Sequence, residues 1–197
     1  MGTDDPSASN AQSLVNEALH MVEIAHPNGW PYLRDTIAFT TTTASEYPFS
    51  TISTTTTIAK VISAKSTAGS TWSPLDVFTP GESDHVYLAA GSTDAPAGYW
   101  VEGETFFLSP SPTAGLTVSL RVVVTEPDLV ADNEEPICPA RFHGAIIAAA
   151  LVVYYETLQD SARSQAAGQR FDGWIGRMMT ATREMGNLPR VRVRSDG

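Results

Sequence analysis

Several features that define common protein classes are missing from this chain of 197 residues. It holds a single cysteine, Cys138, so no disulfide can form within one chain and a secreted disulfide scaffold is excluded. The longest apolar run, residues 144–155, is too short to cross a bilayer. The acidic start, residues 1–6, has neither the basic nor the apolar region of a signal peptide. We therefore expect a protein that folds in a cytoplasm and does not enter a membrane.

Motifs for catalysis and cofactor binding are also missing. The chain has no glycine-rich phosphate loop of the GxGxxG or Walker type and no GxSxG nucleophile turn. Its four histidines, His20, His26, His85 and His143, are scattered without the spacing of metal ligands. We expect no enzymatic activity, no metal and no cofactor.

Two local clusters keep a catalytic alternative open. Ser83, Asp84 and His85 bring a hydroxyl, an acid and an imidazole together, and a hydrolase built on them would lose activity on His85→Ala. Neighbours in sequence seldom form a triad, however, because a triad needs convergence in space. Glu102 and Glu104 could act as paired carboxylates, but their place in a predicted turn favours two solvated acids.

Cys138 and His143 have structural interpretations. Cys138 could be a nucleophile, but a small buried apolar side chain at the start of a helix is the favoured interpretation. We expect His143, in the first turn of that helix, to be packed or hydrogen-bonded rather than bound to a metal.

Charge is divided unequally along the chain. Residues 1–135 hold 17 acidic and 4 basic residues, whereas residues 136–197 hold 5 acidic and 8 basic residues, within a total net charge of −10. The overall acidity argues against a general nucleic-acid binder. The asymmetry indicates a protein whose two ends face different partners.

Apolar residues at helical spacing predict three helices. The first covers residues 11–25, after a polar and flexible stretch over residues 1–10. The second, residues 140–159, is apolar almost all round, so we expect it to be central and buried. The third covers residues 161–185.

The middle of the chain is rich in Thr and Val and predicts β-structure. Two Thr runs, at 40–43 and 54–57, are typical of solvated strand faces. Residues 99–108 predict a hairpin and residues 116–125 a final strand, whereas residues 66–97 predict a loop with one short helical turn near Pro74, Leu75 and Asp76. At least five strands indicate a small barrel or sandwich.

These elements predict an α+β protein in which an N-terminal helix and two C-terminal helices pack together around an inserted small β-barrel or sandwich. The expected parts are an N-terminal arm and helix (1–34), an inserted β domain (35–132), a C-terminal helical pair (133–186) and a basic tail (187–197).

The basic tail alternates Arg and Val in Arg190, Val191, Arg192, Val193 and Arg194. This alternation is typical of a strand that adds to the edge of a partner's sheet. A disordered basic end and contact with DNA phosphates are alternatives.

Three aromatic residues near the hairpin, Trp100, Phe106 and Phe107, leave open a small carbohydrate-binding module. Core packing on a strand face is the favoured interpretation.

The order of the parts, together with a set of spaced residues, resembles a known family. A leading helix ends in a turn that contains Trp30, and the β-domain closes with Gly98-Tyr99-Trp100-x-x-Gly103-x-x-Phe106-x-Leu108-x-Pro110. An acidic linker then leads into Pro136-x-x-Pro139-x-x-x-His143-x-x-Ile146, a long Ala- and Tyr-rich helix, a last helix and a basic tail. Over residues 11–186 this resembles the head-to-tail adaptor (connector) proteins of long-tailed bacteriophages.

The resemblance implies a structural protein of the virion neck, assembled in the host bacterial cytoplasm. Such proteins form a ring, usually of twelve copies, that binds the portal on one side and a stopper or tail protein on the other. It implies portal docking by the tail, through Arg190, Val191, Arg192, Val193 and Arg194. It also implies a channel for double-stranded DNA, which an acidic wall would let pass without sequence-specific binding. A stopper or tail terminator is the alternative within phage necks, but those proteins are mostly β.

Overall fold

A computed structural model describes residues 6–68, 71–79, 81–82, 95–131 and 133–186. The chain divides into two compact units, one of residues 1–32 with 126–197 and one of residues 33–125. The first is helical and the second is built on a sheet, so the predicted α+β class, with helices at both ends of the chain, is confirmed.

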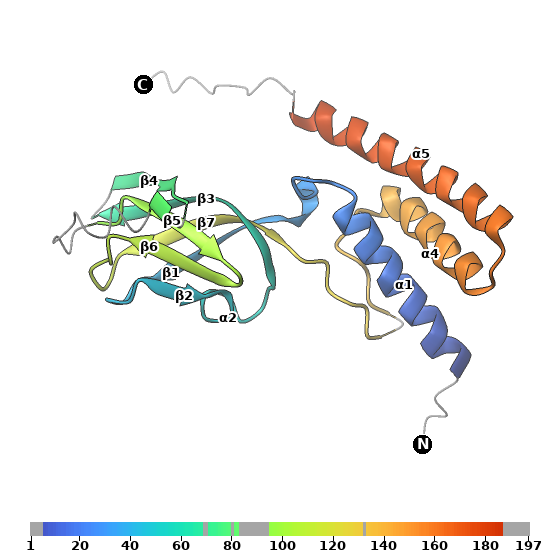
Figure 1. Ribbon diagram of the computed structural model, residues 1–197, viewed down its shortest axis with the longest axis horizontal. Coiled ribbons are helices and arrows are strands. Elements are labelled where there is room, and N and C mark those ends of the chain that lie inside the picture. Colours follow the sequence, from blue (N-terminus) through green and yellow to red (C-terminus); the bar gives the residue numbers. More distant parts are fainter. Residues whose placement is uncertain (1–5, 69–70, 80, 83–94, 132, 187–197) are drawn as a thin grey trace, which may run out of the picture. The chain divides into compact units, whose positions relative to one another are not determined.

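Three long helices make up the helical unit: α1 (Pro6–Ile24), α4 (His143–Thr157) and α5 (Ser161–Gly186). Helix α4 contacts both of the others and lies between them (Figure 1). Its apolar residues on every side explain this central place. Gly144 marks its closest approach to α5, because a Cβ at that position would meet the ring of Trp174 at 2.3 Å.

The first helix begins earlier than its apolar periodicity predicts. Residues 6–10 are helical, so the expectation of a flexible stretch over residues 1–10 is wrong for that part. Pro6 suits the first turn, where its missing N–H has no partner in any case. The turn after α1 ends in a 3₁₀ helix, η1 (Pro31–Leu33), and a second one, η2 (Ala140–Phe142), precedes α4.

Seven strands form one mixed sheet in the order β1-β7-β3-β4-β5-β6-β2. Their bounds are β1 (Arg34–Thr40), β2 (Glu46–Pro48), β3 (Ile58–Ala68), β4 (Thr71–Val77), β5 (Gly98–Glu102), β6 (Thr105–Ser109) and β7 (Thr117–Val124), with the short helix α2 (Phe49–Ile52) after β2. All neighbours are antiparallel except β4 and β5.

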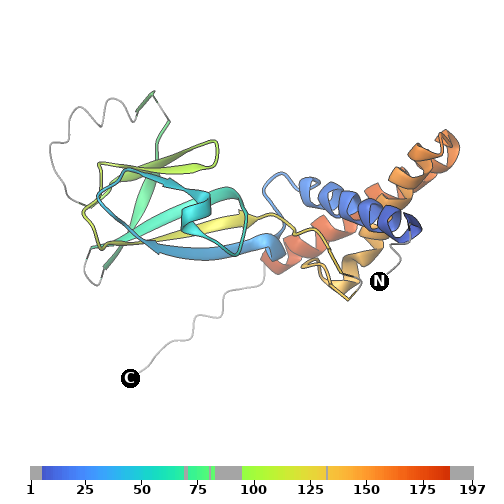
Figure 2. The same cartoon turned by 90° about the horizontal axis from the view of Figure 1, so that it is seen from below.

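The sheet curls into a half-barrel, so that its two edge strands approach each other (Figure 2). The ring of Phe39 on β1 lies 4.9 Å from that of Tyr47 on β2 and 6.1 Å from that of Phe106 on β6. Of the two architectures predicted, the structure is an open barrel made of one sheet rather than a sandwich.

The predicted hairpin and final strand are confirmed. Gly103 turns β5 into β6 with a φ of 57°, a conformation that suits glycine. In β7 the alternate residues Val118, Leu120 and Val122 are fully buried.

Residues 66–77 correct the sequence prediction. The end of β3 and all of β4 occupy this stretch, and Pro74, Leu75 and Asp76 lie in β4 rather than in a helical turn. Leu75 alone is buried in β4, so the strand lacks the apolar alternation that would have revealed it. Pro74 lies near the point where pairing with β3 ends and pairing with β5 begins.

The Thr runs also differ from their prediction as strand faces. Thr40 is the last residue of β1, and residues 54–57 lie in the connection between α2 and β3. Thr41 is buried, where its hydroxyl donates to the carbonyl of Thr113 at 2.7 Å and accepts from the backbone of Leu116 at 3.1 Å. This residue pins a loop rather than covering a strand.

Candidate assembly surfaces

One polar face of α1 holds the segment of residues 126–135, which returns from the sheet toward α4. Gln12, Asn16 and His20 are spaced four residues apart and so share a face. The Asn16 side chain accepts from the Leu129 backbone at 2.9 Å and donates to its carbonyl at 3.1 Å, and Gln12 donates to the same carbonyl at 2.6 Å. The imidazole of His20 lies 2.9 Å from a carboxylate oxygen of Asp128. The acidic linker is therefore a fixed part of the helical unit.

His20 titrates within this contact. Burial lowers its pKa, but hydrogen bonds to Glu23 and Asp128 outweigh that effect, so the pKa lies above its ordinary value. The protonated ring then sits between two carboxylates, at 3.2 Å from Glu23 and 2.9 Å from Asp128. Protonation strengthens the attachment of the segment to α1.

Glu126 fixes the other end of the segment from inside the unit. Only 2% of the residue is exposed, and its carboxylate accepts a 2.5 Å hydrogen bond from the backbone of Ile137 and another from the backbone of Cys138. Burial raises the pKa of this carboxyl, although the two backbone donors oppose the change. The group is a structural acceptor for the turn that precedes α4.

Cys138 and His143 belong to the same turn. Cys138 is buried, accepts a hydrogen bond from Tyr32, and has a thiol pKa raised by burial, so it stays protonated and unreactive. The imidazole of His143 bonds the carbonyl of Cys138 at 2.9 Å. Both residues therefore have the structural roles favoured from the sequence.

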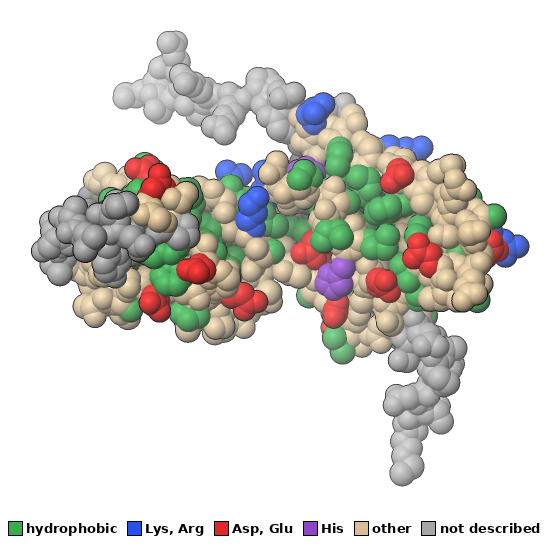
Figure 3. Space-filling model, in the orientation of Figure 1, with side chains coloured by type: hydrophobic (Ala, Val, Ile, Leu, Met, Phe, Trp, Pro, Cys, Tyr) green, Lys and Arg blue, Asp and Glu red, His purple; other side chains and the backbone are tan. Residues whose placement is uncertain are grey.

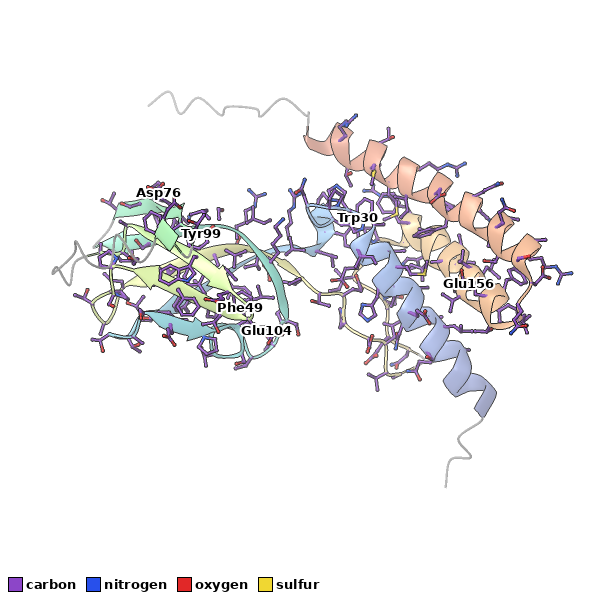
Figure 4. The ribbon with its side chains drawn as sticks, viewed as in Figure 1. Trp30, Phe49, Asp76, Tyr99, Glu104 and Glu156 are labelled. Carbon is purple, nitrogen blue, oxygen red and sulfur yellow. The ribbon has the colours of Figure 1, made fainter. Side chains whose placement is uncertain are left out.

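Trp30 closes the turn after α1. Its indole, labelled in Figure 4, donates to the carbonyl of Val22 at 2.6 Å, and its ring contacts His26 and Tyr32. The residue is completely buried, so this turn, which the sequence singled out, is anchored to the end of α1.

An apolar groove of about 470 Å³ lies between α1 and α4. Leu14, Val15 and Leu19 form one wall, and Ile146, Ile147, Leu151 and Tyr154 form the other. Ile147 is 59% exposed and Tyr154 44% exposed, although both are large apolar side chains. Figure 3 shows hydrophobic side chains gathered over these two helices, with acidic side chains beside them. The expectation of a fully buried second helix is thus wrong on this face of α4.

The outward face of α5 differs from the groove, because it carries small residues where the groove carries large apolar ones. Gly173 and Gly176 are exposed, and a Cβ at either position would meet no atom within 4 Å. A row of arginines with heptad spacing, Arg163, Arg170 and Arg177, flanks this face.

The three aromatic residues near the hairpin do not form one platform. Phe106 is fully buried and stacks on Tyr99 on the concave face, whereas Trp100 and Phe107 are directly opposite each other on the other face, with ring centroids 4.9 Å apart. Alternation along β6 separates the two phenylalanines. Core packing holds for Phe106 alone.

Residues 54–57 line a hydroxyl-rich hollow of about 530 Å³ with Ser50, Ser53 and Glu104. Glu104 accepts from the backbone of Phe49 through its carbonyl at 2.8 Å, while its side chain is exposed (Figure 4). Glu102 is exposed as well, so the two acids are solvated turn residues as expected.

Several predicted site residues lie outside the described residues. These are Ser83, Asp84 and His85 of the catalytic alternative, and Arg190, Val191, Arg192, Val193 and Arg194 of the portal-docking tail. Within the described ranges, no group of three His, Cys, Asp or Glu side chains could hold a metal ion. No helix in those ranges is both long and apolar enough to cross a membrane.

Sequence reasoning missed the groove and the attachment of the segment to α1. The groove had a signal in the fully apolar character of residues 144–155, which one neighbouring helix on each side cannot cover. The attachment of the segment to α1 had a weaker sequence signal, the four-residue spacing of Gln12, Asn16 and His20. The signal is weak because their partners in the segment lie more than 100 residues away in the sequence.

Comparison with protein-family models places the chain in a family. The family model for the SU10 adaptor protein matches residues 1–194 of the chain. No curated protein matches the sequence.

Proposed function

Because the chain belongs to the SU10 adaptor protein family, a family of phage head-to-tail adaptors, we propose that it forms a ring of twelve copies between the portal and the stopper or tail of a virion. Membership of this family implies a place in the phage neck, and structural adaptors of this kind are not normally enzymes. The match across residues 1–194 carries the proposal, because it includes both the helical unit and the inserted sheet.

The helical unit supports a role in assembly. Its groove leaves Ile147 and Tyr154 exposed, and an apolar surface of this kind on a folded subunit marks a contact with another protein. The charges fit as well, since the acidic first part of the chain and the more basic second part can meet between copies.

The net charge of −10 supports a channel through which DNA slides. Acidic walls repel the phosphate backbone, so double-stranded DNA passes without sequence-specific binding or tight retention. The protein assembles in the host bacterial cytoplasm in this proposal.

We propose that the basic tail binds the portal. Arg190, Arg192 and Arg194 alternate with Val191 and Val193, a pattern that suits strand addition to a sheet edge of the portal. In this proposal, charge reversal at Arg192 should weaken attachment to the portal and leave the thermal stability of the subunit nearly unchanged.

Electron microscopy of the protein mixed with its cognate portal tests the proposal. The full chain should form a ring stacked on the portal, and the chain without residues 189–197 should stay folded and fail to attach. A folded full-length protein that never forms a ring on the portal would refute the adaptor assembly. A truncated protein that attaches normally would refute docking by the tail but not the formation of the ring.

A further inference from the structure

The groove between α1 and α4 has the shape of a helix-binding site. Its long walls are helices, residues 11–19 of α1 and residues 143–154 of α4, and Leu129 and Pro136 complete the lining. At a rise of about 1.5 Å per residue these walls run for roughly 12–17 Å, or two to three helical turns. An apolar groove between two helices takes a third helix, whose contact face fits between them.

Helix α5 offers a face that its own subunit does not use. Glycine inside a helix is unfavourable, and Gly144 is explained by the ring of Trp174 against it. Gly173 and Gly176 have no such explanation within the subunit, because a Cβ at either would meet open space. Their place on the exposed side of α5 lets the backbone of another helix come close.

The two surfaces are complementary in size. Ile147 and Tyr154 project from α4 into the groove, and large side chains pack well against a surface of small ones. On α5 the small residues Ala162, Ala166, Gly173 and Gly176 lie along one side of the helix, with the exposed Gln169 between Ala166 and Gly173. The large side chains of α4 on one copy can therefore pack against the small residues of α5 on another copy.

The two surfaces are also complementary in charge. Helix α1 and residues 126–135 together carry seven acidic residues and neither lysine nor arginine. Helix α5 carries four arginines against two acids. The backbone N–H groups of Val130 and Ala131 lower the pKa of Glu134, so this carboxylate of the same segment stays ionised.

We propose that α5 of a neighbouring copy lies in the α1/α4 groove, with Gly173 and Gly176 toward Ile147 and Tyr154 and the arginine row toward the acidic side of α1. The inference rests on the proposed ring. One copy offers α5 and the next offers the groove, and such a head-to-tail contact generates a ring rather than a symmetric dimer. Within each copy α5 lies across α4 from α1, so both surfaces are available at once (Figure 1).

Disulfide cross-linking tests this contact in rings assembled on the portal. The double variant Ile147→Cys with Gly176→Cys should give, on oxidation, a ladder of covalent oligomers that extends to the full ring. Mixed single variants should give a covalent dimer that joins one copy of each. Native Cys138 can remain, because it is buried.

The matched control replaces Ile147 by another exposed apolar residue of the same unit. Ile24→Cys, 78% exposed and outside the groove, combined with Gly176→Cys should give no ladder. Rings that form on the portal but give no Ile147–Gly176 cross-link overturn the docking of α5 while the proposed function stands. Wild-type protein that forms no ring on the portal overturns both.

A second variant tests the same contact without cysteines. A Cβ at Gly176 meets no atom within 4 Å, so Gly176→Leu should leave a folded monomer with an unchanged circular dichroism spectrum. In the ring its side chain would occupy the space of the neighbouring copy, so ring formation should be lost. Normal rings from Gly176→Leu would contradict the inference.

Discussion

At the scale of single residues, Glu126 is the clearest example of a buried polar group with a defined structural task. Its carboxylate accepts from the backbones of Ile137 and Cys138 at the turn before α4. Replacing it with alanine removes the partner of both donors, and the donor of buried Cys138 then costs about 1–3 kcal/mol as an unsatisfied buried group. We expect Glu126→Ala to lower the unfolding free energy of the helical unit by that order, measured by chemical denaturation.

Glu135→Ala is the control for that measurement. Glu135 is exposed, so its loss should change stability by no more than about 0.5 kcal/mol. Equal effects of the two substitutions would show that Glu126 does not organise the turn.

His20 makes the stability of the helical unit depend on pH. Its pKa is higher in the folded protein than in the unfolded chain, because Glu23 and Asp128 stabilise the protonated ring. The stabilisation is complete below the unfolded pKa of about 6.5 and is lost as the pH rises through the folded pKa. We expect the melting temperature to fall between pH 6 and pH 8, and His20→Gln to remove that part of the slope.

Glu126 acts in the same direction at lower pH. Because its folded pKa is raised, the folded state holds the proton more tightly than the unfolded state. Its contribution therefore declines as the pH rises from about 4.5 through the raised folded pKa. A pH slope between 6 and 8 that persists unchanged in His20→Gln would assign the effect to another group.

At the scale of elements, the glycines of α5 lower the stability of the isolated subunit, whatever their role in assembly. Gly173→Ala should raise the stability of the helical unit by about 0.5–1 kcal/mol, because alanine is the better helix former and meets no neighbouring atom. Thermal denaturation of the monomer measures this gain.

Gly103→Ala provides the contrast. Gly103 turns β5 into β6 with a φ of 57°, so a side chain there is strained even though space is free. We expect it to destabilise the sheet unit by about 1 kcal/mol. A loss of stability in Gly173→Ala would mean that this glycine is needed within the subunit.

The elements that the sequence predicts well are those with a strong local pattern. Residues 161–185 have one apolar stripe, and the structure extends the helix by a single residue, to Gly186. The hairpin around Gly103 has a turn residue between two apolar runs. Strand β4 has neither signal, because six of its seven residues are not buried and its pairing depends on β3 and β5. Tertiary contacts decide such a strand.

The candidate assembly surface could be predicted only in part. Ile147 and Tyr154 belong to a stretch that is apolar on all sides, and that pattern alone indicates a central helix. Which side stays open depends on where α1 and α5 pack, and their contacts with α4 join residues far apart in the sequence. The resemblance to adaptor proteins rests on the order of the parts, which is a property of the whole chain, and the family model matches residues 1–194.

At the scale of the whole molecule, the division into two units predicts that each can fold alone. We propose that residues 33–125 are an independent folding unit and that the helical unit survives their replacement by a short glycine-serine linker. The excised protein should keep its helical circular dichroism spectrum and a cooperative thermal transition. A molten helical unit after excision would show that the sheet is needed for its packing.

One pairing in the sheet joins the beginning and the end of the inserted unit. Arg34 at the start of β1 is opposite Val123 near the end of β7, so the chain leaves and re-enters the helical unit at neighbouring points. While the sheet is folded, α1 and residues 126–135 are joined through a short fixed bridge. If the sheet unfolds, the same ends are tied by a flexible loop of about 93 residues, whose closure entropy costs roughly 4 kcal/mol. Folding of the insert therefore keeps these two ends together. Heat or a mutation that unfolds the insert also lowers the stability of the helical unit.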